Sequence, residues 1–241
     1  MGKLYFHYST MNAGKSTMLL QAAHNYVERG LLVYLLTAKL DTRDGEGRIS
    51  SRIGLSEEAH TFKPGDDLYG MLADQLALEP TACVFVDEAQ FLTKEQVWEL
   101  ARFIDDYNIP VMCYGLRVDF CGELFPGSAA LLAIADEMRE VRTICHCGKK
   151  AGMVVRRGPD GKAQRAGAQV LIGGNDVYVS LCRRHWREEM GDLSPASAKA
   201  AQGAVFGDRP PAIETARVGS PTGDTLVGGR SADDIESESP K

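Results

Sequence analysis

Short apolar runs alternate with amphipathic stretches along the first half of the chain. The apolar runs predict strands at 4–8, 31–37, 83–86 and 110–114. Residues 16–29 have apolar positions at helical spacing, and Gly30 stands where that helix should end. A second helix is predicted over 93–107, with Thr93 as its cap and Gln96 three residues later. Strands that alternate with helices indicate βαβ units, and therefore an α/β fold with a mostly parallel sheet.

The pattern changes in the rest of the chain. Residues 38–65 are polar and show no sustained period, so they predict a mobile loop. Beyond 141 there are short β-like pieces at 152–155 and 170–172, separated by a polar segment, which predict a small second lobe. About a third of the last 50 residues are Gly, Pro or Ser, which is typical of a disordered tail. We therefore expect three parts, at 1–141, 142–191 and 192–241.

Composition and charge narrow the class of protein. Hydrophobic residues make up 44% and charged residues 25%, which is ordinary globular usage and excludes a fibrous repeat or wholesale disorder. The net charge of −6 disfavours a dedicated nucleic-acid binder. No apolar run reaches the roughly 18 residues that span a bilayer, and the start lacks the pattern of a secretory signal. We expect a cytosolic protein without a membrane partner.

Residues 9–17 carry a phosphate-binding pattern between the first strand and the first helix. They match G-x-x-x-x-G-K-[ST] at every fixed position except the first, where Ser9 replaces glycine. In such a loop, successive backbone N–H groups converge on an anion at the helix N-terminus. Lys15 would reach the β and γ phosphates, and the Ser16 hydroxyl would bind Mg²⁺. The predicted nucleotide site comprises Ser9, Thr10, Met11, Asn12, Ala13, Gly14, Lys15, Ser16 and Thr17.

Two carboxylates, Asp87 and Glu88, end the apolar strand at 83–86. Ligands of parallel α/β sheets bind at the carboxyl ends of the strands. Asp87 fits the acidic residue that holds Mg²⁺ in phosphate-loop enzymes. Glu88 can accept a proton from whatever attacks the γ-phosphate. ATP hydrolases also carry an Asp-Glu pair here, so the attacking group can be water or a substrate hydroxyl.

Three of the six cysteines and one histidine form a candidate metal site. The set is Cys145, Cys147, Cys182 and His185, and four such ligands without a carboxylate are typical of structural zinc. His146 is a rival ligand, but it lies between two bound neighbours, so we favour His185. Cys83 and Cys113 lie in apolar runs and are expected in the core, whereas Cys121 has no assigned role.

Taken together, these motifs resemble the cytosolic, zinc-containing type of thymidine kinase, and its bacterial members most closely. The likeness runs from Leu4 to Glu188 and covers nearly everything before the tail. It rests on the residues at 8–17, 50–55, 86–92 and 113–120, together with the four metal ligands. Each motif is common by itself, but their occurrence together in this order is highly specific.

The resemblance implies a P-loop, RecA-like sheet flanked by helices, with a small zinc-ribbon-like lobe. It also implies transfer of the ATP γ-phosphoryl group to the 5′-hydroxyl of thymidine or deoxyuridine, with Mg²⁺ required and Glu88 as the base. Near the phosphates it adds Asp41, Arg43, Asp87, Ala89 and Gln90. Around the nucleoside it implies Met11, Phe91, Leu116, Phe120, Phe125, Val170, Leu171, Ile172, Gly173, Gly174 and Tyr178.

The family also suggests features that no pattern in the chain reveals. Members are homotetramers inhibited by thymidine triphosphate, and the insert between their zinc ligands forms a lasso over the base. Here 169–175 matches the contacting end of that lasso. Phe91, Phe125 and Tyr178 also fit a simpler role as core residues.

The sequence leaves two other functions open as alternatives. A nucleic-acid-dependent ATPase with a zinc ribbon is favoured by the local charge of 142–190, which has about ten Lys and Arg against about four acids. The acidic chain as a whole and the short core oppose it. A nucleotide sensor without turnover would require Glu88 to be idle.

Overall fold

The computed structural model describes residues 1–41, 45–170 and 177–191. At its centre is a six-stranded, wholly parallel sheet, formed by β1 Leu4–Ser9, β2 Val33–Ala38, β5 His60–Phe62, β6 Cys83–Val86, β7 Val111–Leu116 and β8 Glu137–Glu140. The strand order is β5-β2-β6-β7-β1-β8. The predicted parallel sheet is confirmed, and the strand predicted at 83–86 has the same bounds in the structure.

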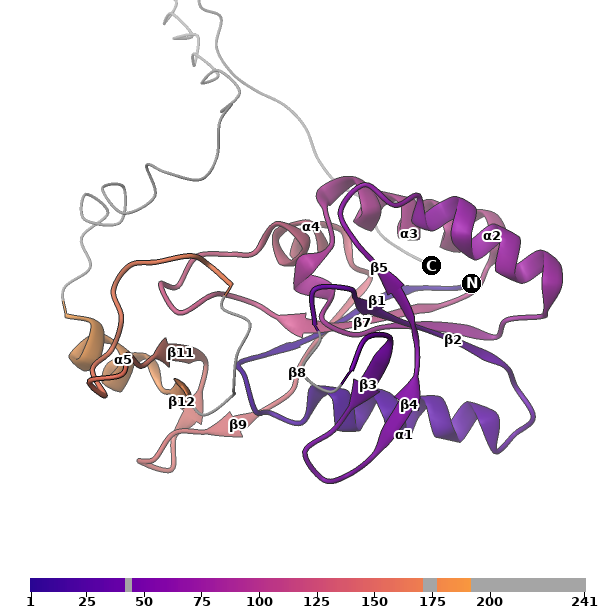
Figure 1. Cartoon of the computed structure of the whole chain (residues 1–241). Helices are drawn as coiled ribbons and strands as arrows, with labels where there is room; N and C mark the ends of the chain where they lie inside the picture. The colour runs from indigo at the N-terminus through magenta and orange to yellow at the C-terminus, as the bar shows by residue number, and fades with distance from the viewer. Residues whose placement is uncertain (42–44, 171–176, 192–241) are drawn as a thin grey trace, which may run out of the picture. The chain divides into compact units, whose positions relative to one another are not determined.

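Helices cover both faces of this sheet (Figure 1). They are α1 Lys15–Val27 on one face and α2 Leu68–Leu78, α3 Lys94–Tyr107 and α4 Pro126–Ile134 on the other. Side chains alternate along β6, so Val84 and Val86 join one apolar cluster with α2, α3 and α4, whereas Cys83 and Phe85 join another with α1. Because both faces are covered, the strand is apolar throughout.

The start of α3 has the predicted capping arrangement. The Thr93 hydroxyl accepts a hydrogen bond from the Gln96 N–H at 3.2 Å, and the Gln96 side-chain oxygen accepts one from the Thr93 N–H at 3.0 Å. These two bonds satisfy N–H groups that lack partners at a helix start. The Gln96 amide nitrogen also donates to the Lys63 carbonyl at 2.8 Å, so it attaches α3 to the segment before α2.

The prediction of a mobile loop over 38–65 is wrong for much of that segment. It contains a hairpin of β3 Arg48–Ser50 and β4 Ser56–Glu58, followed by β5 at the edge of the main sheet. Each of these strands has only three residues, which is too short for the alternation of apolar and polar positions to be recognised.

The second lobe consists of β9 Thr143–Ile144, β10 Lys150–Ala151, β11 Met153–Arg156, β12 Tyr178–Leu181 and α5 Arg183–Met190. The β-like piece predicted at 152–155 corresponds to β11, which pairs with β12. The strand predicted at 170–172 is wrong at Val170, which lies in no strand. Residues 171–172 lie outside the described residues. Val155, Leu181 and Met190 form a separate apolar cluster for this lobe.

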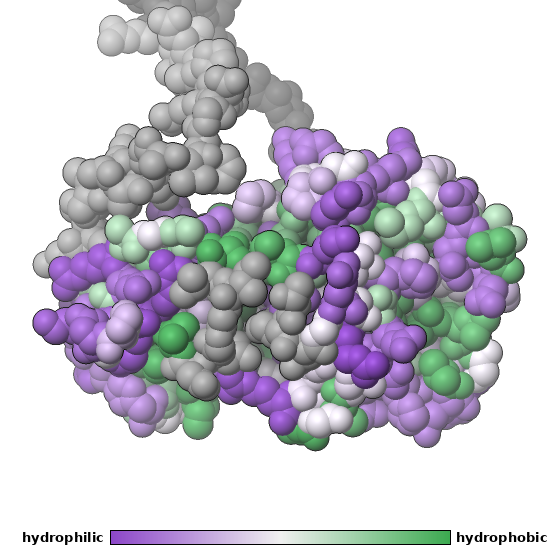
Figure 2. All heavy atoms as spheres, viewed as in Figure 1, coloured by the Kyte–Doolittle hydropathy of each residue, from purple (hydrophilic) through white to green (hydrophobic). Residues whose placement is uncertain are grey.

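All described residues belong to one compact unit. The boundary between 1–141 and 142–191 stays a prediction, and the predicted tail, 192–241, lies outside the described residues. Among the helices of the described ranges, none has both the length and the apolar composition that a bilayer crossing requires. Hydrophilic and hydrophobic residues are interspersed over the face shown in Figure 2.

Candidate functional site

The carboxyl ends of β1, β6 and β7 open into a cavity of about 420 Å³. This volume suits a small-molecule ligand. Most of the predicted site residues line it, although they come from segments far apart in the sequence. They are Met11, Asn12, Ala13, Gly14, Lys15, Ser16, Thr17, Asp41, Asp87, Glu88, Gln90, Phe91, Leu116, Phe120, Phe125, Val170 and Tyr178.

A few predicted residues do not line the cavity. Ser9, Thr10 and Ala89 are buried beside it. The Ser9 hydroxyl donates to the Val141 carbonyl, so this side chain is held by the segment after β8, and a serine is accommodated where the pattern expects glycine. Arg43, Leu171, Ile172, Gly173 and Gly174 lie outside the described residues.

The loop between β1 and α1, residues 10–14, has the backbone form of an anion-binding turn. Gly14 stands immediately before α1 with φ of +84°, a left-handed conformation that side chains with a Cβ disfavour. Lys15, the first residue of α1, donates from Nζ to the Thr10 carbonyl at 2.9 Å, across the base of the loop. The first turn of α1, whose N–H groups have no acceptor within the helix, therefore begins at this loop, next to the buried Lys15 side chain.

Asp87 lies opposite this helix start, at the end of β6. The Ser16 hydroxyl donates to its carboxylate at 2.8 Å, and only 4% of the residue is exposed. Burial raises the pKa of Asp87 above its usual range, and the charge of Glu88 raises it further. A hydroxyl and a carboxylate oxygen that meet in this way form a donor set suited to Mg²⁺.

Glu88 follows Asp87 with a strained backbone. Its φ of +52° and ψ of +36° lie in the left-handed region, which is uncommon for a residue other than glycine. Such conformations cluster at functional sites, where the surrounding structure holds them in place. The residue comes directly before the 3₁₀ turn η1 Ala89–Phe91, so the chain bends sharply at the strand end and the carboxylate lines the cavity.

Aromatic and aliphatic side chains line another part of the cavity. The rings of Phe91 and Phe125 pack edge to face, with centroids 6.0 Å apart. Phe125 is buried, and Phe91 also packs against the core under α2, α3 and α4, so both rings belong to the core and to the cavity wall. Leu116 from the end of β7 and Tyr178 from β12 complete this apolar part.

Some residues that line the cavity have no role predicted from the sequence. They include Ile49, Ser50, Ser51, Arg52 and Ile53 from β3 and the turn after it, together with Leu40, Val118, Asp119 and Val154. Residues 50–55 and 113–120 contributed to the family resemblance, which was the available signal, but no role was attached to most of them. The hairpin of β3 and β4 brings the first group to the cavity.

Asp119 connects two segments that line the cavity. One carboxylate oxygen accepts hydrogen bonds from the N–H groups of Cys121 and Glu123, both at 2.9 Å. The other oxygen accepts a bond from the Gln169 side-chain amide at 3.1 Å. Asp119 therefore fixes the turn after β7 and attaches the end of segment 157–170 to it.

Ser180 of β12 connects the second lobe to loop 10–14. Its hydroxyl donates to the Met11 carbonyl at 2.7 Å and lies 3.0 Å from the Thr10 hydroxyl. Tyr178, two residues earlier on the same strand, lines the cavity. One short strand therefore contacts both the loop and the cavity.

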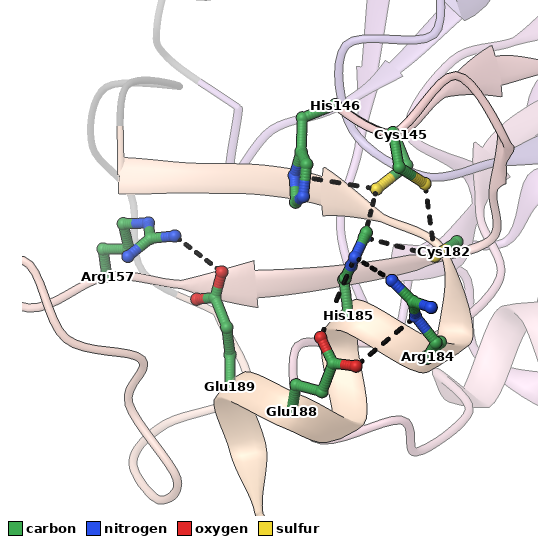
Figure 3. Close-up of polar contacts among 9 residues, drawn as sticks. Cys145, His146, Arg157, Cys182, Arg184, His185, Glu188 and Glu189 are labelled. Carbon is green, nitrogen blue, oxygen red and sulfur yellow. Dashed lines mark hydrogen bonds and ion pairs between the residues drawn. The ribbon is translucent and has the colours of Figure 1, made fainter.

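The predicted metal ligands come from the turn between β9 and β10 and from the start of α5, where Figure 3 shows Cys145, Cys182 and His185 close together. The ligand atoms of Cys145, Cys147, Cys182 and His185 all lie within 4.8 Å of one another. Tetrahedral zinc, with Zn–S near 2.3 Å, places sulfurs about 3.8 Å apart and sulfur and nitrogen about 3.6 Å apart. The Cys147 and Cys182 sulfurs are 3.9 Å apart, and the Cys182 sulfur is 3.5 Å from His185 Nδ1. This cluster can therefore hold zinc.

His185 is the histidine of this four-residue cluster, and His146 lies beside it. The His146 ring stacks on that of His185, with centroids 4.2 Å apart, and its Nδ1 is 3.7 Å from the Cys145 sulfur. The carboxylate of Glu188 lies 3.8 Å from His185 Nε2 (Figure 3). At 3.8 Å this contact is not a hydrogen bond, and the Arg184 guanidinium lies closer to His185 Nε2, at 2.9 Å.

Comparison with known proteins agrees with this site. The family model described as thymidine kinase matches residues 2–186. A thymidine kinase of Jannaschia sp. (strain CCS1) is 66% identical over 193 residues, covering 80% of this chain and 99% of the relative. One from Ruegeria pomeroyi is 67% identical, covering 80% and 97%, and one from Yersinia pseudotuberculosis is 55% identical, covering 78% and 96%. The chain therefore belongs to the thymidine kinase family.

Proposed function

We propose that this protein transfers the γ-phosphoryl group of ATP to the 5′-hydroxyl of thymidine, and of deoxyuridine, to give the nucleoside monophosphate. The main support is that one cavity contains both a helix-start loop suited to phosphates and the carboxylate of Glu88, beside an apolar wall suited to a small base. The names of the similar proteins agree with this reaction.

On the ATP side, loop 10–14 and the start of α1 bind the triphosphate. Backbone N–H groups at a helix start attract anions, and Lys15 adds a full positive charge next to them. Asp41 belongs to this part of the cavity, and Arg43 is assigned to it by resemblance. Phosphoryl transfer depends mainly on such positioning and charge neutralisation.

Ser16 and Asp87 are the residues that would hold Mg²⁺ with the nucleotide. Their side-chain oxygens are 2.8 Å apart, and both line the cavity. When bound, the ion neutralises charge on the β and γ phosphates. The carboxylate of Asp87 is buried beside the charge of Glu88. A bound cation would therefore stabilise its ionised form.

Glu88 acts as the general base. It takes the proton of the sugar hydroxyl as the oxygen attacks the γ-phosphorus, and a positioned base of this kind typically contributes about 10²–10⁴-fold to the rate. The left-handed backbone at Glu88 turns the chain at the end of the strand, and the residue lines the cavity. In this proposal the attacking group is the nucleoside alcohol, bound against the apolar wall next to Glu88.

Phe91, Leu116, Phe125 and Tyr178 form the wall against which the base binds. The second lobe completes the cavity from the other side through Val154 and Val170. Leu171, Ile172, Gly173 and Gly174 would supply main-chain contacts to the base, as the resemblance implies. Backbone groups can reject a base with a different edge by leaving polar atoms unpaired. Structural zinc at the cysteine cluster would supply folding energy for this small lobe.

The test is to incubate the purified chain with γ-labelled ATP and thymidine, and separately with ATP and single-stranded DNA. We expect label on the nucleoside. DNA-stimulated phosphate release without label on thymidine would instead support the ATPase alternative.

The role of Glu88 has a specific test. Glu88→Gln keeps the shape of the side chain but cannot take a proton, so we expect it to bind ATP and to lose at least about 100-fold in kcat. Glu79→Gln, at the exposed end of α2, is the matched control and should behave like wild type. A near-normal rate for Glu88→Gln would place the base elsewhere.

By the same resemblance, we propose a cytoplasmic homotetramer that thymidine triphosphate inhibits as end product. Sedimentation analysis of the full chain tests the assembly, since a tetramer has four times the mass of 26.2 kDa. Competition between thymidine triphosphate and thymidine in the labelled assay tests the inhibition.

A further inference from the structure

Gln90 has both ends of its side-chain amide occupied by different parts of the site. The residue lies in η1, two positions after Glu88, and only 1% of it is exposed. Its oxygen accepts a hydrogen bond from the Leu116 N–H at 2.9 Å, at the end of β7. Its nitrogen donates to the carboxylate of Glu88.

These two bonds fix which way the amide points. The Leu116 N–H can only donate, so the oxygen of the amide has to face it. The NH₂ group then has to face Glu88, because a flipped amide would set two donors against each other at Leu116. The orientation of the amide is therefore dictated by the backbone of β7 and does not depend on a ligand.

The backbone around Gln90 leaves just enough space for this arrangement. A Cβ added at Gly115, the residue before Leu116, would lie 2.8 Å from the Gln90 side-chain oxygen and 3.0 Å from its backbone nitrogen. Real Cβ atoms do not approach so closely. Glycine at 115 thus lets the amide lie against β7, and the strained turn at Glu88 brings the carboxylate within reach of its nitrogen.

We propose that Gln90 is a positioning residue for Glu88. Its amide holds the carboxylate in one orientation relative to β7, whose Leu116 also lines the cavity. This inference rests on the proposed function, in which Glu88 accepts the proton of the nucleoside hydroxyl. It differs from the direct role near the phosphates that the family resemblance implies for Gln90, because here the residue acts through Glu88.

Gln90→Glu changes the contact of this side chain with Glu88 and keeps its hydrogen bond with the Leu116 N–H. It has the same shape and keeps an oxygen for the Leu116 N–H, but it sets a second carboxyl group against Glu88 in place of the amide NH₂. We expect kcat to fall at least about tenfold, as for a misplaced catalytic group, with KM for ATP and for thymidine within about threefold of wild type. Gln90→Met, which has no charge and no donor, should show the same split if Gln90→Glu does not fold.

Gln96→Glu is the matched control. Gln96 is buried to a similar extent, accepts from a backbone N–H through its oxygen and donates to the Lys63 and Asp66 carbonyls through its nitrogen, but it lies at the start of α3. We expect Gln96→Glu to lower the melting temperature and to leave kcat within about twofold of wild type. Bound zinc and melting temperature are measured for every variant.

A double-variant cycle gives the decisive readout. If Gln90 acts through Glu88, adding Gln90→Glu to Glu88→Gln should reduce kcat less than about threefold further, because the group to be positioned is already gone. Fully multiplicative losses would overturn the proposal, and so would a tenfold rise in KM for ATP with unchanged kcat. If wild type does not phosphorylate thymidine, the proposed function fails. If wild type does so and Gln90→Glu has normal kcat, only the positioning role fails.

Discussion

The guanidinium of Arg156 lies over the ring of Phe120, 3.9 Å from its centroid. Both residues are nearly fully buried. Arg156 also donates from Nε to the Gln164 side-chain oxygen at 2.6 Å and from Nη1 to the Ala168 carbonyl at 2.8 Å. One buried cation therefore holds the polar segment after β11 against a ring that lines the cavity.

Arg156→Met should weaken nucleoside binding more than ATP binding. The change keeps much of the apolar length but leaves the Gln164 and Ala168 oxygens without their donor, so segment 157–170 should pack less tightly against Phe120. We expect KM for thymidine to rise about tenfold, which corresponds to about 1.4 kcal/mol, with KM for ATP nearly unchanged. Steady-state kinetics measures both.

Arg156→Lys should fail to rescue, because an ammonium cannot both stack on the ring and reach two acceptors. Arg183→Met, an exposed change on α5, is the control and should have little effect. Unchanged thymidine kinetics in Arg156→Met would show that this contact has no part in holding the cavity.

Ser180→Ala should affect the ATP side. It removes the hydrogen bond from β12 to the Met11 carbonyl, and a partly buried bond of this kind contributes about 1 kcal/mol. We therefore expect KM for ATP to rise about three- to tenfold while bound zinc stays at wild-type level. Ser180→Thr keeps the hydroxyl and suits a strand, so it should restore most of the affinity. Equal losses in Ala and Thr variants would point to packing rather than to the hydrogen bond.

The zinc cluster is tested by metal analysis of single substitutions. Cys182→Ser removes a thiolate from the set, so bound zinc should be lost and the melting temperature should fall. His146→Ala should retain zinc, because His185 supplies the nitrogen. Loss of zinc in His146→Ala together with its retention in His185→Ala would reverse this assignment.

His7 should make stability depend on pH. Within the described residues, its Nδ1 is a buried atom without a hydrogen-bond partner, and its ring stacks on Tyr114 with centroids 4.4 Å apart. Burial, with a smaller effect of Arg139, lowers the pKa of His7 from 6.5 to about 4. The unfolded chain therefore binds a proton at higher pH than the folded protein does, and stability falls as pH decreases from 6.5 towards 4.

The expected loss from this group is at most about 3 kcal/mol, since one pKa unit is about 1.4 kcal/mol. Urea unfolding at several pH values measures it. His7→Phe keeps a ring against Tyr114 but cannot be protonated, so its stability should fall less over the same range. Parallel pH profiles for the two proteins would contradict this role of His7.

Sequence patterns predicted the elements whose signal is local. The strand at 83–86 is apolar throughout because both faces are covered, and α3 begins with a recognisable capping pair. The carboxylates after that strand could be assigned to a ligand-binding site, because ligands of parallel α/β sheets bind at the carboxyl ends of the strands. The three-residue strands β3, β4 and β5 carry too few positions to show a period.

Relationships between distant residues could not be obtained in this way. Nothing in the pattern around Gln90 indicates that its amide faces Leu116, 26 positions later, because that contact depends on β6 and β7 being neighbours. Likewise, the sequence pattern showed Arg156 only as one of the basic residues in segment 142–190. Its burial follows from stacking on Phe120 and from two acceptors, Gln164 and Ala168, which its own segment provides.

Strand β12 makes the length of this part of the chain critical. Tyr178 and Ser180 lie on β12 and Cys182 follows it directly, and they reach the base wall, the loop at the phosphates and the metal cluster, respectively. Successive side chains of a strand point to opposite sides. Inserting or deleting a single residue here would change the parity of the strand, so at least one of the three contacts would be lost at once. Sequence drift in this stretch can proceed by substitution but not by a change in length.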